Sequence, residues 1–394
     1  MAEIENFVCS ICGNVNKRFV GTRNGKKYCR KCISFRGQEA SGEYTQNDDA
    51  EYTLRYSLSK EQQELSDILV KNFKNGLDSM VNAVCGSGKT EIVMKVISYA
   101  IKNKKKVGFS VPRKDVVIEL QERFKDVFKK NVVVSVYGGH TSIIEGDLVC
   151  LTTHQLFRFD NYFDLLIMDE IDAYPFKGND VLEKMCRRSV KGNLILMSAT
   201  SKEKEVRGLF KHNYNKVELY TRFHGHPLPV PKIIKGNSFY LLFNLIRETK
   251  RFIRNGKPVF IFVPTIEICE KTYDFLKYFI KNGDFVHSQK ESRNDTISRF
   301  RKGKIKYLVT TAVLERGVTV RDVQVIILFA DSSIYNAAAL VQISGRVGRK
   351  IDAPDGEVIY LAKSNTKDMI ESIQIIQDAN NKLFKKRRNP YENI

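Results

Sequence analysis

The sequence predicts an α/β protein with two consecutive doubly wound parallel-sheet domains, preceded by a small four-cysteine module. From residue 54 onward, short runs rich in Val, Ile and Leu alternate with helix-like stretches. This alternation is typical of buried parallel strands and the helices that cover them. A proline-rich break at residues 224–231 interrupts it, and four cysteines gather near the N-terminus. The predicted divisions are a zinc-binding domain with its linker (1–53), a first sheet domain (54–223) and a second one (224–394).

Length and composition are those of a folded protein with a polyanionic partner. The 394 residues leave room for two or three domains, and a hydrophobic content of 42% with 28% charged residues is ordinary. The formal net charge of +20 is not ordinary. It favours nucleic acid or an anionic membrane surface as partner, the alternative being a merely lysine-rich surface. No run approaches the ~20 apolar residues of a membrane span, and the N-terminus lacks a signal-peptide pattern, so we expect a cytoplasmic protein.

The N-terminal module contains two CxxC pairs separated by sixteen residues, formed by Cys9, Cys12, Cys29 and Cys32. Four thiolates in this pattern predict a Zn²⁺ site that is structural, because no coordination position stays open. The residues between the pairs suit a hairpin turning at Asn24-Gly25, and so small a core is expected to need the metal. Six residues make the module basic: Lys17, Arg18, Lys26, Lys27, Arg30 and Lys31. Contact with nucleic acid and docking to a protein both stay open. The polar segment 37–52 is interpreted as a linker.

The two sheet domains are predicted from apolar runs. In the first domain we expect strands at residues 79–84, 105–111, 147–153, 164–170 and 193–200, with helices at 89–103 and 113–128. In the second domain we expect strands at 258–264, 305–311, 323–329 and 356–362.

The stretch VNAVCGSGKTEI lies between the first expected strand and the first expected helix, where a phosphate-binding loop belongs. Gly86 and Gly88 allow backbone N–H groups to turn toward phosphates. Lys89 supplies a cation to the β and γ phosphates, and the Thr90 hydroxyl suits Mg²⁺. Ala83 stands where such loops usually begin with glycine, and its small side chain permits the turn. The expected ATP contacts in this loop are Ala83, Gly86, Ser87, Gly88, Lys89 and Thr90.

The apolar stretch DLLIMDEID ends in carboxylates. Asp169 is suited to hold Mg²⁺, and Glu170 is suited to polarise the attacking water as a general base. A polar strand end that caps the next helix is the alternative. Together with Lys89, these carboxylates predict an enzyme that hydrolyses a nucleoside triphosphate.

In the stretch LVQISGRVGRK, Gln342, Arg346 and Arg349 are interspersed with Gly345 and Gly348 at fixed spacings. It resembles the sixth motif of superfamily 2 helicases. The resemblance implies two tandem RecA-like domains, in which Gln342 lies near ATP and both arginines act on the γ-phosphate. Such arginine fingers can accelerate hydrolysis by about 10³- to 10⁵-fold.

Further motifs of that superfamily follow in order. AVCGSGKT is similar to the first motif, DEID to the DEAD or DEAH box, SAT to the third and TTAVLERGVTV to the fifth. By this resemblance Gln62 reads the adenine edge, with the adjacent Gln63 as the alternative, and Gly317 lies near ATP. The residues implied to contact nucleic acid are Arg113, Thr153, His154 and Thr311.

The cysteine module combined with DEIDAYPF, RFHGHPLPVP and LERGVTV resembles the ComFA family, the ATPases of natural transformation in Gram-positive bacteria. The likeness runs from Cys9 to about residue 385. It implies ATP, Mg²⁺ and Zn²⁺ as cofactors. It also implies a motor that helps to draw single-stranded DNA through the membrane channel ComEC, alongside the partner ComFC. Peripheral association with the inner face of the membrane, and an oligomer, are compatible with it.

Three basic runs are candidates for phosphate contacts: 102–106, 301–306 and 385–388. The alternative for each run is an ordinary solvent-exposed surface, and the last run also suits anionic lipid.

Two other functions stay open. One is another superfamily 2 motor, a replication-restart DNA helicase or an RNA helicase. The other is a non-motor adaptor, in which the zinc module binds a protein and the nucleotide only switches conformation.

Overall fold

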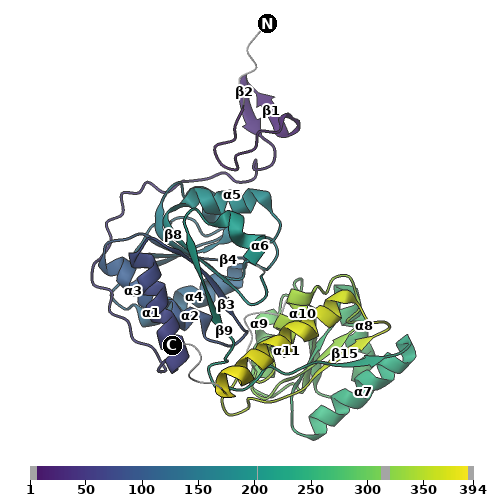
Figure 1. The fold of residues 1–394 in the computed structure, drawn as a ribbon. Coiled ribbons are helices and arrows are strands. Elements are labelled where there is room, and N and C mark those ends of the chain that lie inside the picture. The colour runs from purple at the N-terminus through teal and green to yellow at the C-terminus, as the bar shows by residue number, and fades with distance from the viewer. Residues whose placement is uncertain (1–6, 202, 312–319, 389–394) are drawn as a thin grey trace. The chain divides into compact units, whose positions relative to one another are not determined.

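The structure is a computed structural model that describes residues 7–201, 203–311 and 320–388. The chain forms two compact units (Figure 1). The first comprises residues 1–83 and 88–219, and the second comprises residues 220–394 together with the short segment 84–87. The division therefore falls between Leu219 and Tyr220, close to the predicted boundary at residues 223/224.

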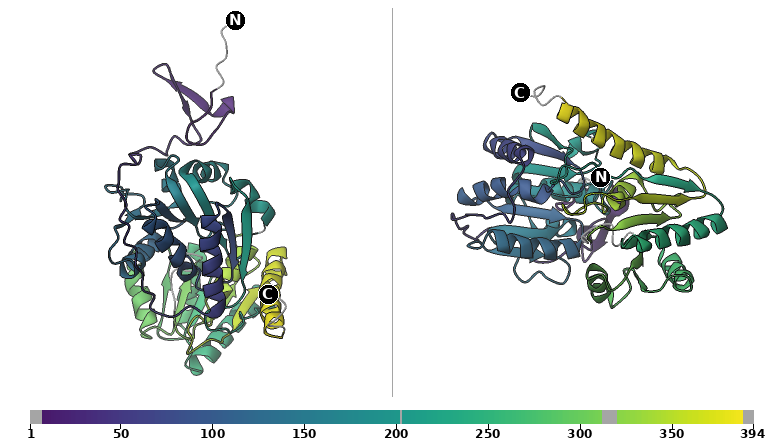
Figure 2. Two further views of the ribbon diagram at one scale, coloured as in Figure 1. Left: turned by 60° about the vertical axis from the view of Figure 1, so that its left-hand side comes forward. Right: turned by 90° about the horizontal axis from the view of Figure 1, so that it is seen from below.

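The cysteine module is built on a two-stranded antiparallel hairpin, β1 (Val20–Arg23) and β2 (Lys26–Cys29), preceded by the 3₁₀ turn η1 (Lys17–Phe19). The turn residues Asn24 and Gly25 have φ angles of 49° and 72°. Two positive φ angles match the twist of a tight hairpin, which explains why Asn-Gly stands there. Figure 1 shows this hairpin next to the end of the first unit that carries α5, and Figure 2 shows the chain from two further sides.

The segment predicted as a linker is not a free tether but packs along the first unit. The Glu145 carboxylate accepts hydrogen bonds from the backbone N–H groups of Ser41 (3.2 Å) and Gly42 (2.9 Å). Asp147 accepts one from the backbone N–H of Asn47 at 2.8 Å. Two carboxylates of the sheet domain therefore satisfy backbone donors of a segment that has no regular secondary structure of its own.

The first unit contains a seven-stranded, wholly parallel sheet in the order β5-β6-β4-β7-β8-β3-β9. Its strands are β3 (Asp78–Ala83), β4 (Val107–Val111), β5 (Val133–Val136), β6 (Leu148–Thr152), β7 (Phe163–Met168), β8 (Val190–Ser198) and β9 (Tyr214–Leu219). Its helices are α1 (Lys60–Lys74), α2 (Lys89–Ile92), α3 (Met94–Lys102), α4 (Lys114–Val127), α5 (Asp180–Ser189) and α6 (Glu203–Val206), with 3₁₀ turns η2 (Thr153–Arg158) and η3 (Arg207–Leu209). Helices α1, α3 and α4 cover one sheet face, while α5 and η2 cover the other.

The second unit contains a six-stranded, wholly parallel sheet in the order β10-β15-β14-β11-β13-β12. Its strands are β10 (Lys232–Lys235), β11 (Val259–Phe262), β12 (Gly283–Val286), β13 (Tyr307–Thr310), β14 (Gln324–Leu328) and β15 (Val358–Ala362). Helices α7 (Ser238–Arg254) and α8 (Ile266–Lys277) cover one face. The opposite face carries α9 (Arg293–Arg301), α10 (Ala337–Ser344) and α11 (Lys367–Arg388).

The predicted fold class is confirmed, since both sheets are parallel and carry helices on both faces. Every strand expected from an apolar run forms. The helix expected over residues 89–103 is divided at Val93 into α2 and α3. Four short strands were not predicted: β5, β9, β10 and β12. Within the part of the chain that the structure describes, none of the helices is long and apolar enough to cross a membrane.

Helix α11 is tied to the segment that leads into the second unit. The Asn380 side chain accepts a hydrogen bond from the Leu228 backbone N–H at 2.8 Å and donates one to the Leu228 carbonyl at 2.9 Å. Leu228 packs with Val341 of α10 and with Ile376 and Ala379 of α11, all of them buried. The C-terminal helix is therefore an integral part of the second unit's core.

Candidate active site

Three segments that carry candidate catalytic residues leave the first sheet at the carboxyl ends of neighbouring strands. The phosphate loop follows β3, the two carboxylates follow β7, and the SAT sequence closes β8, which lies between them. Carboxyl ends of parallel strands meet at one edge, and ligands of open α/β sheets bind there.

The phosphate loop depends on glycine at two positions. Gly86 and Gly88 have φ angles of 81° and 78°, which L residues with a side chain rarely adopt. At Gly88 an added Cβ would also lie 2.6 Å from Nε2 of Gln62. The backbone conformation requires the second glycine, and a Cβ there would also displace the end of the Gln62 side chain.

Gln62, rather than Gln63, is the glutamine that lies beside this loop. Its Oε1 accepts the Ser59 backbone N–H at 2.9 Å and closes a capping box at the start of α1. Gln62 is 5% exposed, whereas the Gln63 side chain donates to Asp67 on the exposed side of the helix. The cap fixes the orientation of Gln62, and its reading of adenine stays a prediction.

Lys89 and Asp169 face each other across the sheet edge. Lys89 Nζ lies 3.9 Å from Asp169 Oδ1, and both side chains are less than one-fifth exposed. A half-buried cation beside a carboxylate suits a nucleotide phosphate and its Mg²⁺, because each group then meets the opposite charge. Thr90 is the next residue in the chain and lies within α2. Thr90 and Asp169 are the residues that would hold Mg²⁺.

Glu170 has a backbone conformation that glutamate seldom adopts. Its φ is 59°, in the left-handed region, and its N–H donates to Asp169 Oδ1 at 2.8 Å. A residue with a Cβ pays on the order of 1–3 kcal/mol to be held there. Strained residues of this kind concentrate at active sites, which agrees with the role predicted for Glu170 as general base.

The SAT sequence is joined directly to the carboxylate segment. Thr200 Oγ1 donates to Asp172 Oδ2 at 2.5 Å. The hydroxyl oxygen of Ser198 accepts the backbone N–H groups of Thr200 (3.0 Å) and Ser201 (2.8 Å). These hydrogen bonds connect the carboxylate segment to the end of β8.

The predicted arginine fingers occupy a tight loop after α10 in the second unit. Arg346 is 2% exposed, and Arg349 is half-buried with its Nε donating to the Gly345 carbonyl at 2.9 Å. Gln342, on α10, is 6% exposed. Gly348 has a φ of 66°, and a Cβ there would lie 2.0 Å from the Pro354 carbonyl oxygen. Only glycine fits at position 348, so the spacing of glycines and arginines in the motif reflects the geometry of this turn.

Arg222 is a positioning residue that the sequence did not reveal. Its guanidinium is buried and donates to the carbonyls of Gly345 (3.1 Å), Val347 (2.7 Å) and Gly348 (2.9 Å). His224 Nε2 lies 2.8 Å from the same Gly348 carbonyl. Burial, with the charge of Arg349 nearby, lowers the pKa of Arg222 to about 10, so it stays protonated at pH 7. Its fork of donors holds the loop that bears the predicted fingers.

Replacing Arg222 with Met is expected to lower kcat for ATP hydrolysis by about 10²-fold, because a misplacement near 1 Å has that effect. The carbonyls of Gly345, Val347 and Gly348 each lose one donor, so the thermal unfolding midpoint should also fall. The control is Arg251→Met, since Arg251 is 40% exposed and pairs with Glu357 at 2.8 Å on the same unit. A kcat in Arg222→Met equal to that of the control would contradict the positioning role.

The four predicted zinc ligands come together. Cys9, Cys12, Cys29 and Cys32 are all buried, and their Sγ atoms lie within 4.8 Å of one another. Cys9 and Cys32 are separated by 3.3 Å between sulfurs, and Cys12 and Cys29 by 3.6 Å. Sulfurs at the corners of a ZnS₄ tetrahedron with ~2.3 Å bonds are about 3.8 Å apart, so the donor set fits zinc.

The predicted nucleic-acid contacts lie in different surroundings. Arg113 caps α4, with Nη2 3.6 Å from Asp115, and Thr311 is 7% exposed after β13. Thr153 is 1% exposed, and His154 stacks on Phe35 with ring centroids 6.0 Å apart. Their contact with nucleic acid stays a prediction. Gly317 lies outside the described residues.

Comparison with known proteins matches both halves of the chain to helicase families. Residues 55–203 match the family described as type III restriction enzyme, res subunit, and residues 241–350 match the helicase conserved C-terminal domain. Competence protein ComFA of Bacillus subtilis is 33% identical, over 94% of this chain and 85% of that protein. Competence protein ComFA of Streptococcus pneumoniae is 32% identical, over 89% and 86%.

The chain belongs to the ComFA family. The fold is also that of S. cerevisiae Dbp5 bound to RNA and ADP BeF3, with a TM-score of 0.59 and 17% identity over 82% of this chain and 92% of that one. This likeness shows the tandem RecA-like architecture alone. As a ComFA-family member with both helicase domains, the chain is an ATP-hydrolysing superfamily 2 enzyme, an ATP-dependent helicase or translocase of competence.

Proposed function

We propose that this chain is an ATP-driven translocase of single-stranded DNA that draws transforming DNA into the cell. Its ComFA-family membership over nearly the whole chain carries the proposal. The Lys89–Asp169 pair at one sheet edge and the strained Glu170 beside it support an active nucleotide site. The net charge of +20 suits a polyanionic track that is gripped by its phosphates.

In this proposal each residue around the nucleotide has its own role in hydrolysis. Lys89 binds the β and γ phosphates, and Thr90 and Asp169 would hold Mg²⁺, which would neutralise charge on the transferred phosphoryl group. A water attacks the γ-phosphorus in line, its proton passes to Glu170, and the bond to the β-phosphate oxygen breaks to release ADP. Arg346 and Arg349 stabilise the charge of the transition state. ATP binding and release are then coupled to changes in the grip on the strand.

The proposed partners follow from the family. Single-stranded DNA is the track, the membrane channel ComEC supplies it, and ComFC acts alongside. A place at the inner face of the membrane agrees with this arrangement and with the basic helix α11, whose run Lys385–Arg388 suits anionic lipid.

Zinc is the metal proposed for the four-cysteine cluster. Four buried thiols at near-tetrahedral separations suit Zn²⁺ with no open position, which makes the site structural. The module around it has little apolar core of its own, so the metal would hold β1 and β2 together with the CxxC turns.

Removing the metal is expected to unfold the module and leave the ATP site in place. Structural zinc contributes on the order of 10–16 kcal/mol in small zinc modules, more than this hairpin can replace. Chelated protein should be cut by trypsin at the basic residues of the module, such as Lys26 and Arg30, while zinc-loaded protein resists. Restoring Zn²⁺ should restore resistance. Equal trypsin sensitivity before and after chelation would argue against a structural metal.

The test of the proposed function is ATP turnover by the purified chain with single-stranded DNA, duplex DNA, structured RNA or no nucleic acid. We expect strong stimulation by single-stranded DNA. Stimulation by RNA alone would favour an RNA helicase, and turnover that no nucleic acid changes would favour the adaptor. Movement is measured separately, as the ATP-dependent displacement of streptavidin from the biotinylated end of a single strand.

A further inference from the structure

The cysteine module is strongly and uniformly basic. Residues 7–37 contain eight Lys and Arg residues and no Asp or Glu: Lys17, Arg18, Arg23, Lys26, Lys27, Arg30, Lys31 and Arg36. A zinc tetrathiolate carries two negative charges, so a metal-loaded module would keep a net charge of +6. Lys31 is paired with Asp180 of α5 at 2.9 Å and attaches the module to the first unit. Lys27 and Arg36 are exposed. Such a surface attracts a polyanion.

Within this basic surface, Tyr28 is held in a fixed orientation. Tyr28 on β2 pairs with Gly21 on β1, and a Cβ on Gly21 would lie 2.4 Å from the Tyr28 ring. The ring therefore lies directly over the glycine, while the residue as a whole stays half-exposed. An aromatic ring fixed in this way can stack on a base without losing much side-chain freedom.

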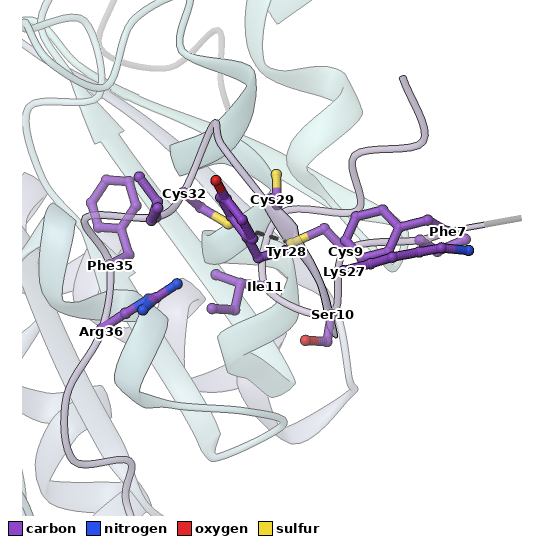
Figure 3. A pocket seen from close by; sticks show the side chains of 12 residues that line it. Phe7, Cys9, Ser10, Ile11, Lys27, Tyr28, Cys29, Cys32, Phe35 and Arg36 are labelled. Carbon is purple, nitrogen blue, oxygen red and sulfur yellow. Dashed lines mark hydrogen bonds between the residues drawn. The ribbon is translucent and has the colours of Figure 1, made fainter. Parts of the chain in front are cut away.

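Tyr28 borders a pocket of about 210 Å³ between the hairpin and the segment that follows it (Figure 3). Figure 3 shows Lys27 and Phe7 on one side of Tyr28, and Arg36 and Phe35 on the other. The pocket is smaller than the ~300–1,000 Å³ sites that enclose drug-sized ligands. Cys9, Cys29 and Cys32 also line the pocket, so bound zinc would occupy part of its volume. The space that remains suits at most one planar ring system between Lys27 and Arg36, as one base of a phosphate-bearing strand requires.

The same pocket adjoins a segment that the sequence predicts to lie on the nucleic-acid track. Phe35, which lines the pocket, stacks on His154 at a centroid distance of 6.0 Å and an interplanar angle of 20°, and contacts Phe157 at 5.9 Å. Both partners belong to η2. His154 is the residue of η2 that stays partly exposed, so a strand that contacted His154 would lie next to Phe35 and the pocket.

We propose that the cysteine module is a second binding site for single-stranded DNA, in which Tyr28 stacks on one base while Lys27 and Arg36 contact the flanking phosphates. This inference rests on the proposed function, which makes single-stranded DNA the track. The charge of the module favours a nucleic acid over a protein partner, and the site reads no sequence because every base presents a π face.

The test measures oligothymidylate binding to the full zinc-loaded chain by fluorescence anisotropy at several salt concentrations. Tyr28→Leu should weaken binding by about 5- to 100-fold, and Tyr28→Phe should bind like the parent, because the phenyl ring still stacks. The double variant Lys27→Gln with Arg36→Gln should lower the slope of log K against log salt by about 1.4, since two single-strand phosphate contacts are lost.

A matched double variant, Lys17→Gln with Arg23→Gln, removes the same charge from the module away from the pocket and should leave the slope nearly unchanged. Equal changes in both double variants, or unchanged binding in Tyr28→Leu, would overturn the proposal and leave protein docking as the module's role. Zinc content is measured in every variant, so that loss of the fold is not mistaken for loss of the site.

Photocrosslinking locates the contact directly. An oligonucleotide carrying iodouracil should crosslink to the peptide that contains Tyr28, and crosslinks confined to other peptides would contradict the site.

The proposed function and the second DNA-binding site can be contradicted by different results. A parent chain that binds no single-stranded DNA contradicts the proposed function, whereas a parent that binds it and pocket variants that bind equally well contradict only the second site.

Discussion

Replacing Arg349 with alanine is expected to lower the rate of ATP hydrolysis by about 10³- to 10⁵-fold, the range that arginine fingers contribute. The fold should survive, because Arg222 continues to hold the carbonyls of Gly345, Val347 and Gly348. The substitution removes the hydrogen bond from Arg349 Nε to the Gly345 carbonyl, which the Arg222 guanidinium still contacts. ATP turnover with saturating single-stranded DNA is the measurement, with circular dichroism as the check on folding.

Two companion variants make the Arg349 result specific. Arg349→Lys keeps the positive charge but loses the planar fork, so it should recover only part of the rate. Arg321→Ala is the control, since Arg321 is 70% exposed and pairs with Asp352 at 2.6 Å on the same unit. Hydrolysis by Arg349→Ala within tenfold of this control would remove the finger assignment.

Glu170→Gln is expected to lower kcat by about 10²- to 10⁴-fold while ATP still binds, because the amide keeps the size of the carboxylate but cannot accept the proton. The protein contains no tryptophan, so the fluorescence of a labelled ATP analogue can be followed without indole emission. The control is Glu205→Gln, whose side chain is 41% exposed and pairs with Lys177. Loss of ATP binding in Glu170→Gln, or near-normal turnover, would contradict the role of general base.

The backbone at Glu170 allows a sharper version of this test. At a φ of 59°, glycine avoids the strain that any Cβ introduces. Glu170→Gly should therefore be inactive and yet unfold at a temperature no lower than the parent. A marked loss of stability in this variant would mean that the conformation is not strained, and that the carboxylate serves mainly to support the fold.

The sequence predicted the strands that are long and buried on both faces, because their apolar runs are continuous. It did not predict β5, β9, β10 and β12, which are the edge strands of the two sheets. Most residues of β9 and β10 are partly buried or exposed, and β5, β10 and β12 have only four residues each. Short edge strands contain too few apolar residues to be distinguished, and their neighbours decide whether they form. The polar segment 37–52 was taken for a linker for a related reason, since its partners Glu145 and Asp147 are a hundred residues away.

At the site, the sequence predicts residues whose chemistry is local, such as Lys89, Asp169 and Glu170. It missed Arg222, because an arginine beside a Gly- and Pro-rich break is ordinarily exposed. In the fold the guanidinium is buried among carbonyls of a loop more than a hundred residues away, and no carboxylate of the described residues pairs with it. The signal available was the stretch RFHGHPLPVP, which marks the family but carries no role by itself.

The attachment of α11 to Leu228 limits how the basic tail can be studied. Shortening the protein to delete Lys385–Arg388 along with the rest of the helix would also remove Asn380 and uncover Leu228 and Val341. A truncated protein that lost activity would then report a damaged core rather than a lost electrostatic contact. Charge-neutralising substitutions at Lys385–Arg388 preserve the helix, and they are the change that isolates what those cations do.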